Sequence, residues 1–106
     1  MIAMNKELFQ KYAMEGNQPV LVEYWAPWCV YCRRIAPALK KLSEQQEGNL
    51  VVAQVNIDDE PALAQRERIE VIPTMILYQN GEALGSIVAP ESKARIEEFI
   101  SETLGE

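Results

Sequence analysis

Cys29 and Cys32 are the only thiols in the 106-residue chain, and two residues separate them. A disulfide that closes so short a loop adds little stability, because loop-closure entropy grows with loop length. In a reducing compartment such a pair is more often catalytic or metal-binding than structural. Zinc needs about four ligands, and the chain has neither a second C-x-x-C nor any histidine. The spacing therefore predicts redox chemistry, with a metal shared between molecules and an inert pair as the alternatives.

The cysteines fall where a strand gives way to a helix. Residues 19–25 are almost continuously apolar, which indicates a strand covered on both faces, and a helix is predicted from residue 29 or 30 to residue 46. At a helix N-terminus the free N–H groups and the helix dipole favour a thiolate. Cys32 follows one turn later. The spacing thus predicts that Cys29 is an exposed nucleophile and Cys32 a sheltered resolving thiol.

The remaining periodicity predicts the elements that must position this pair. Further helices are expected over residues 5–16, 58–68 and 92–104, and further strands over residues 50–57, 74–79 and 82–88, with Asn80-Gly81 as a hairpin turn. The β-α-β unit makes the first two long strands parallel, and the hairpin adds antiparallel strands. We therefore expect one α/β domain over residues 1–106, with a central mixed β-sheet flanked by helices on both faces.

Composition excludes several other functions. Sixteen acidic and ten basic residues give a net charge of −6, which argues against nucleic-acid binding and favours a soluble monomer. The absence of histidine removes serine–histidine triads and most metal sites. No apolar run approaches the ~20 residues that a membrane span needs. The first residues do not resemble a signal peptide, so a cytoplasmic location without membrane attachment is expected.

Several motifs resemble those of a known family. Residues 25–37, Trp-Ala-Pro-Trp-Cys-Val-Tyr-Cys-Arg-Arg-Ile-Ala-Pro, are similar to the active-site segment of the thioredoxins, and the similarity continues through Val-Asn-Ile-Asp at 55–58, Ile-Pro-Thr at 72–74 and Asn-Gly-Glu at 80–82. It covers residues 8 to 104. The resemblance implies a thioredoxin fold and a protein disulfide reductase with no bound cofactor, only a redox-active Cys29–Cys32 disulfide. It also implies disulfide-containing protein substrates and a reductase, such as a thioredoxin reductase, as electron donor.

The same resemblance gives roles to matching positions. Cys29 would attack a substrate disulfide, and Cys32 would resolve the mixed disulfide. Pro73 matches the family's cis-proline beside the active site, where Ile72 would offer backbone groups to an extended substrate. Trp28 matches a surface tryptophan that packs against partners. Together these residues would form the catalytic pair and much of the substrate-binding surface.

The chain departs from the family pattern around the active site. Val30-Tyr31 stands between the cysteines where thioredoxins usually carry Gly-Pro, and these residues help set the reduction potential and the choice of partner. We expect a potential less reducing than the value of about −270 mV for thioredoxin. Ala89 replaces a glycine that lets partners approach closely, so its methyl group is expected to narrow the range of partners. Only residues 2–4 remain for the first edge strand, which should be short or absent.

A carboxylate is also altered. Glu23 stands where thioredoxins have a buried aspartate that takes the proton from the resolving cysteine. Burial should raise the pKa of Glu23, which suits a group that must accept and release a proton. Gln54 replaces a lysine that often neighbours this carboxylate, and a glutamine cannot stabilise the ionised form by charge. We therefore predict that Glu23 completes the catalytic set.

Two other functions fit the same residues. Tyrosine at the position of Tyr31 recurs in glutaredoxins and some disulfide isomerases, so a glutaredoxin-like or isomerase-like enzyme is one alternative. Against a true glutaredoxin, the chain has a helix before the first long strand and lacks a Gly-Gly pair after the proline loop. The other alternative is a non-enzymatic redox-responsive binding module, whose Cys29–Cys32 state gates docking through Trp28, Ile72 and Ala89.

Overall fold

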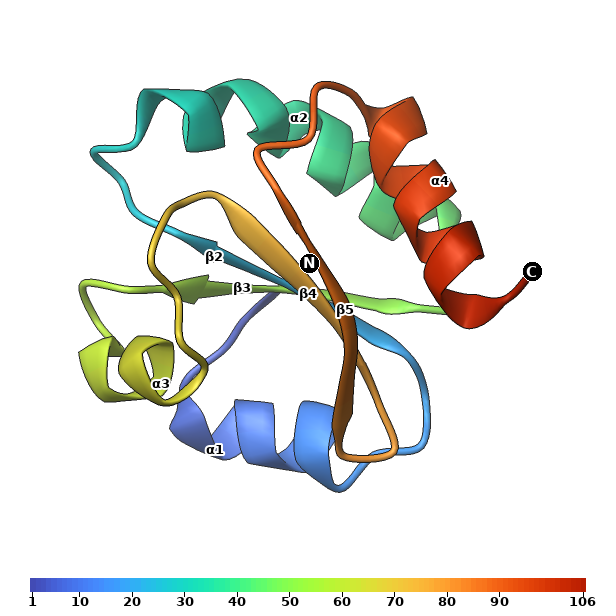
Figure 1. Ribbon diagram of the computed structural model, residues 1–106, viewed down its shortest axis with the longest axis horizontal. Helices are drawn as coiled ribbons and strands as arrows, with labels where there is room; N and C mark the ends of the chain where they lie inside the picture. The colour runs from blue at the N-terminus through green and yellow to red at the C-terminus, as the bar shows by residue number, and fades with distance from the viewer.

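Five strands form one mixed sheet in the computed structural model, which describes residues 1–106 (Figure 1). They are β1 (Ile2–Ala3), β2 (Val20–Trp25), β3 (Val51–Asn56), β4 (Thr74–Gln79) and β5 (Glu82–Val88), in the spatial order β1-β3-β2-β4-β5. β1, β3 and β2 run parallel, whereas β4 and β5 add antiparallel pairs. The expected mixed α/β sheet is confirmed.

Helices cover both faces of the sheet. Figure 1 shows α2 (Val30–Gln45) and α4 (Lys93–Leu104) on one side, with α1 (Lys6–Phe9) and α3 (Pro61–Arg66) on the other. α1 continues directly into the π-helical turn η1 (Gln10–Met14). No helix combines the length and apolar character needed to cross a membrane. The layers thus follow the order of elements that the sequence predicts.

Alternation along β2 explains the two-sided core. Tyr24 and its neighbours two and four residues earlier pack in the cluster that contains Phe9 and Leu63, on the α1 and α3 side. Leu21 packs instead with Leu39 of α2. Because successive strand residues point to opposite faces, Glu23 must lie on the same face as Leu21, beneath α2. The strand therefore directs its one charged side chain toward the helix that begins at the cysteines.

Local signals set most of the element boundaries. The Asn5 side chain accepts the Leu8 N–H at 2.9 Å and begins α1, as its cap position predicts. Asn80 and Gly81 both have positive φ, at 55° and 79°, which is the requirement of the tight hairpin turn between β4 and β5. α3 ends at Arg66, earlier than expected, and Arg68 then adopts a φ of 60° that no right-handed helix can include.

The first edge strand is short but present. Ile2 and Ala3 pair in parallel with Ala53 and Gln54 of β3, and the Met4 N–H continues the contact to the Gln54 carbonyl at 2.8 Å. This outcome agrees with the expected short strand. Since β1 pairs only through Ile2 and Ala3, the other residues of β3 have no strand partner on this side.

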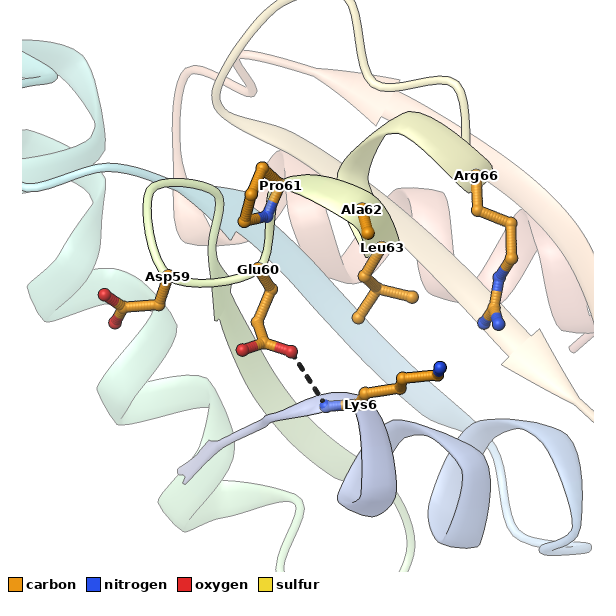
Figure 2. Close-up of a pocket in the computed structure, with 7 residues that line it drawn as sticks. All are labelled: Lys6, Asp59, Glu60, Pro61, Ala62, Leu63 and Arg66. Atoms are coloured by element: carbon orange, nitrogen blue, oxygen red, sulfur yellow. Dashed lines mark hydrogen bonds between the residues drawn. The ribbon is translucent and has the colours of Figure 1, made fainter.

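One pocket lies on the α1 and α3 side, and Figure 2 shows the residues that line it. Across its mouth the Lys6 N–H donates to Glu60 Oε1 at 3.0 Å, which joins the start of α1 to the start of α3. The lining residues are Lys6, Asp59, Glu60, Pro61, Ala62, Leu63 and Arg66. None of them is a thiol or another residue of the predicted site.

Candidate active site

Cys29 and Cys32 form a disulfide at the N-terminus of α2, with their Cα atoms 5.3 Å apart. Cys29 is the N-cap residue, and its Sγ accepts the Cys32 N–H at 3.1 Å. A thiolate formed at this sulfur would keep that donor and the positive end of the helix dipole. The local structure therefore favours negative charge on Cys29.

The two cysteines differ less in exposure than the spacing predicts. Cys29 is 8% exposed and Cys32 is 2% exposed, so both are buried. The prediction that Cys29 is exposed is therefore wrong. Its sulfur lies at the first turn of α2, where it accepts the Cys32 N–H. Because so little of Cys29 is accessible, a partner that reaches it must also contact the residues around it.

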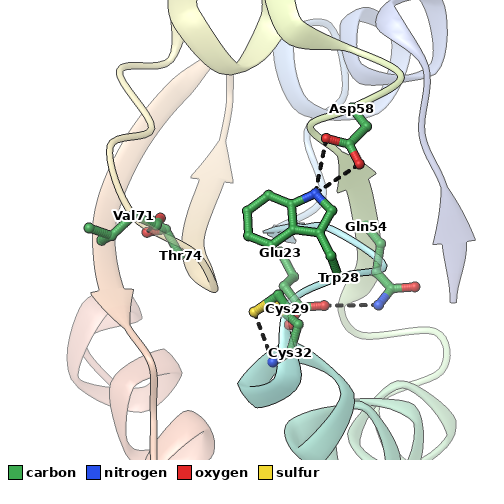
Figure 3. The surroundings of a disulfide bond; sticks show 8 residues. All are labelled: Glu23, Trp28, Cys29, Cys32, Gln54, Asp58, Val71 and Thr74. Atoms are coloured by element: carbon green, nitrogen blue, oxygen red, sulfur yellow. Dashed lines mark hydrogen bonds between the residues drawn. A yellow bond between two sulfur atoms is a disulfide. The ribbon is translucent and has the colours of Figure 1, made fainter.

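Glu23 is fully buried beneath this end of α2. Figure 3 shows its carboxyl group between the disulfide and Gln54, whose Nε2 donates to Glu23 Oε1 at 2.8 Å. The other oxygen, Oε2, is buried without a hydrogen-bond partner. Burial raises the pKa of Glu23 from 4.5 to about 7, although the Gln54 hydrogen bond opposes part of that rise. Such a group can both accept and release a proton near neutral pH.

A surface pocket brings solvent close to this carboxyl group. Cys32 lines the pocket from α2 and Gln54 lines it from β3, so both neighbours of the Glu23 carboxyl group meet the same opening. The full lining is Met1, Trp25, Cys32, Arg33, Ala36, Pro37, Lys40 and Gln54. Solvent in the pocket thus contacts Gln54, the residue that donates a hydrogen bond to the buried Glu23 carboxyl group.

Trp28 lies on the surface beside the disulfide, with 64% of its area exposed. Its Nε1 donates to Asp58 Oδ2 at 3.0 Å, which holds the indole ring over the site (Figure 3). This role of Asp58 was missed in the sequence. A signal existed, since β2 and β3 are parallel and Asp58 closely follows β3 at the sheet edge where β2 ends. Parallel strands bring the residues that follow them together at one edge.

The loop before β4 forms another side of the site. The Ile72–Pro73 peptide bond is cis. Thr74 Oγ1 donates to the Val71 carbonyl at 2.6 Å, and the Ala89 N–H donates to the Pro73 carbonyl at 2.9 Å. These bonds hold the loop from both ends. Val71 is 53% exposed, and its apolar surface was not identified from the sequence.

The atypical residues between the cysteines have different surroundings. Val30 is 53% exposed. Tyr31 is half-buried, and its hydroxyl donates to the Pro90 carbonyl at 2.9 Å. Ala89 has a φ of 44°, a conformation that favours glycine. The contact with Pro90 could not be inferred from sequence, because 59 positions separate the two residues.

The site holds no arrangement suited to a metal ion, since no group of three or more cysteine, aspartate or glutamate side chains lies together. What the fold assembles is a disulfide at a helix N-terminus, a buried carboxyl group beneath it and a proline loop beside it. Cys29 and Cys32 supply the redox couple. The site is therefore that of a thiol–disulfide oxidoreductase.

Comparison with known proteins gives the family. A family model described as Thioredoxin matches residues 1–102, and the chain belongs to the thioredoxin family. It is 33% identical over 100 residues to the thioredoxin of Buchnera aphidicola, which covers 94% of this chain and 92% of that protein. It is 32% identical over 96 residues to Thioredoxin 1 of a Nostoc species, with 91% and 90% covered.

A third relative combines two activities in its name. The chain is 36% identical over 91 residues to the bifunctional thioredoxin reductase/thioredoxin of Mycobacterium leprae, which covers 86% of this chain and 20% of that protein. Membership of the family, together with the Cys29–Cys32 disulfide, supports disulfide reductase activity. Neither a glutaredoxin-like or isomerase-like enzyme nor a non-enzymatic binding module is favoured by these matches.

Proposed function

We propose that this protein reduces disulfides of other proteins in two exchange steps. In the first, the Cys29 thiolate attacks one sulfur of the substrate disulfide. A Cys29–substrate disulfide forms, and the second substrate sulfur leaves as a thiolate. The N-cap position of Cys29 and the Cys32 N–H 3.1 Å from its sulfur support this assignment, because both stabilise the attacking thiolate.

In the second step Cys32 resolves the mixed disulfide. Its thiol gives a proton to Glu23, and the resulting thiolate attacks Cys29 Sγ. The Cys29–Cys32 disulfide forms, and the remaining substrate sulfur leaves as a thiolate, so two electrons have passed to the substrate. The buried position of Glu23 and its pKa of about 7 support its role as the proton acceptor.

We assign substrate binding to the surface around Cys29. Trp28 flanks the disulfide from one side, and the Ile72–Pro73 loop and Ala89 lie next to one another through the Ala89 N–H bond to Pro73. Exposed Val71 and Val88, at 53% and 54%, extend the apolar surface. An extended segment of a protein disulfide, with apolar side chains next to its cysteine, fits such a surface. Val30 and Tyr31 are proposed to tune the reduction potential.

Electrons must be restored after each cycle. We propose that a reductase such as a thioredoxin reductase supplies them, and the bifunctional relative, whose name joins the two activities, supports this pairing. The disulfide itself is the redox group, so no bound cofactor is needed. A reducing compartment would keep the pair cycling, which favours the cytoplasm. We propose that the chain acts there as a monomer, with one domain over residues 1–106.

The observation that carries the proposal is the Cys29–Cys32 disulfide at the start of α2, next to Glu23. The test is reduction of insulin in the presence of NADPH and a thioredoxin reductase. We expect many turnovers per molecule. Cys29→Ser should abolish them, whereas Cys32→Ser should stop after one equivalent and accumulate a mixed disulfide. If the unaltered chain stopped after one equivalent, a redox-responsive binding module would be the better description.

A further inference from the structure

Two distant segments meet at the Tyr31 hydroxyl group. This oxygen donates to the Pro90 carbonyl at 2.9 Å and so joins the first turn of α2 to the loop between β5 and α4. Figure 1 shows this loop returning from β5 toward α2 before α4 begins. Tyr31 is half-buried, which protects the bond from competition with water.

The loop is also held on its opposite side. The Ala89 N–H donates to the Pro73 carbonyl at 2.9 Å, one residue before the bond that Pro90 accepts. Ala89 has a φ of 44°, a backbone conformation that is higher in energy for alanine than for glycine. A strained residue persists where the surrounding structure holds it. Here one hydrogen bond is made by the Ala89 N–H and the other by the next carbonyl group, that of Pro90. The hydrogen bonds to Tyr31 and Pro73 thus both hold the backbone at Ala89 in place.

These bonds form one continuous connection from the cysteine pair to the proline loop. It runs from Tyr31 through Pro90 and Ala89 to Pro73. We propose that the Tyr31 hydroxyl is a specificity-determining strap: it positions the 88–90 segment against the Ile72–Pro73 loop and thereby preforms the surface that binds protein disulfides. The inference rests on the proposed function and assigns Tyr31 a role beyond tuning the potential.

The shape of the surface next to the strap supports selectivity for large substrates. An open depression is lined by Ile87, Val88, Ala89, Pro90, Glu91 and Arg95. The depression includes Pro90, which the Tyr31 hydroxyl bonds, so a bound protein segment would extend over it, whereas a small disulfide needs only the sulfur. A binding surface that already has its bound shape avoids the entropic cost of becoming ordered during association. Loss of the strap should therefore weaken binding of protein disulfides and spare small ones.

The test compares Tyr31→Phe with the unaltered protein on insulin and on bis(2-hydroxyethyl) disulfide. Tyr31→Phe keeps the ring and removes only the hydroxyl. The loss of one hydrogen bond should raise KM for insulin roughly 3–10-fold, with kcat/KM for the small disulfide changed by less than about twofold. Tyr12→Phe is the matched control, because Tyr12 is also half-buried but lies in η1 on the other side of the sheet. It should change neither value.

Amide hydrogen exchange tests the strap directly. The Ala89 N–H should exchange several-fold faster in Tyr31→Phe and at an unchanged rate in Tyr12→Phe. An unchanged Ala89 rate, or equal effects on both substrates, would overturn the inference. If the unaltered protein reduced neither substrate, the proposed reductase function would fail instead, while the Ala89 exchange rate would still decide whether Tyr31 holds the loop.

Discussion

Gln54 Nε2 lies 2.8 Å from Glu23 Oε1 and donates a hydrogen bond to it, whereas Glu23 Oε2 is buried with no partner. The bond favours the ionised carboxylate, but it compensates only part of the cost of burial. The pKa of Glu23 therefore stays near 7. A positively charged residue in place of Gln54 would favour ionisation more strongly. This pair thus holds the carboxyl group close to the midpoint of its titration at neutral pH.

Glu23→Gln should slow the second exchange step far more than the first. Glutamine retains the shape and the contact with Gln54 but cannot accept a proton from Cys32. Loss of a positioned general base lowers the rate of such a step by roughly 10²-fold. Rapid-quench experiments that separate formation of the mixed disulfide from its resolution would measure both rates. Equal slowing of the two steps would contradict the assignment.

Burial of Glu23 also predicts a pH dependence of stability. Between pH 4.5, where the unfolded side chain ionises, and about 7, where the folded one does, the unfolded state binds fewer protons. The stability that Glu23 contributes is therefore fully present below pH 4.5 and is lost as the pH rises through about 7. Across this range the free energy of unfolding falls by an amount on the order of 3 kcal/mol. Urea unfolding of the disulfide form from pH 4 to 9 would show this fall.

Glu23→Gln provides the comparison for that experiment. The variant has no group to titrate at this position, so its stability should lack this fall. Its stability relative to the unaltered protein should therefore increase as the pH rises. If the two proteins followed parallel curves, Glu23 would not carry the proton that its burial implies.

Substitution of Gln54 should move the pH dependence of the second step. Gln54→Leu removes the bond that favours the carboxylate, which raises the pKa of Glu23 further and shifts the midpoint of the rate profile to higher pH. Gln54→Lys adds a positive charge and should shift it to lower pH. Gln79→Leu is a control, because its amide bonds to Asn17 and not to the site. Identical midpoints in all variants would contradict the coupling.

The residues between the cysteines should set a reduction potential less negative than about −270 mV, the value for thioredoxin. Equilibration of the Cys29–Cys32 pair with a glutathione buffer measures it. Replacing Val30 by glycine and Tyr31 by proline should make the potential more reducing. A value at or below about −270 mV for the unaltered chain would show that Val30 and Tyr31 are tolerated without effect.

Ala89→Gly should stabilise the protein. Glycine relieves the positive φ of 44° but gains more freedom in the unfolded chain. The net increase in the free energy of unfolding should be about 0.5–1 kcal/mol. Ala83→Gly, in the exposed strand β5, is the control and should lower stability instead. A loss of stability in Ala89→Gly would mean that the methyl group makes a favourable contact.

Much of the architecture was predictable because its signals are local. Apolar runs and helical periodicity predicted every long strand and helix, and Asn80-Gly81 predicted the hairpin turn. α3 ends earlier than predicted because Arg68 has a positive φ. The sequence does not indicate this conformation, since arginine usually avoids it. Motif spacing was enough to select Cys29 and Cys32 as the redox pair, since the chain has no other thiol.

Local signals were enough to predict the chemistry: a lone C-x-x-C at a predicted helix start, a carboxylate in an apolar strand, and no histidine. The control of that chemistry depends on tertiary contacts. The hydrogen bonds of Trp28 with Asp58 and of Tyr31 with Pro90 join residues distant in the chain. The burial of Cys29, and of Glu23 Oε2 without a hydrogen-bond partner, also arises only in the folded chain. Such contacts depend on how layers pack and on the register of strands, and no local periodicity records them.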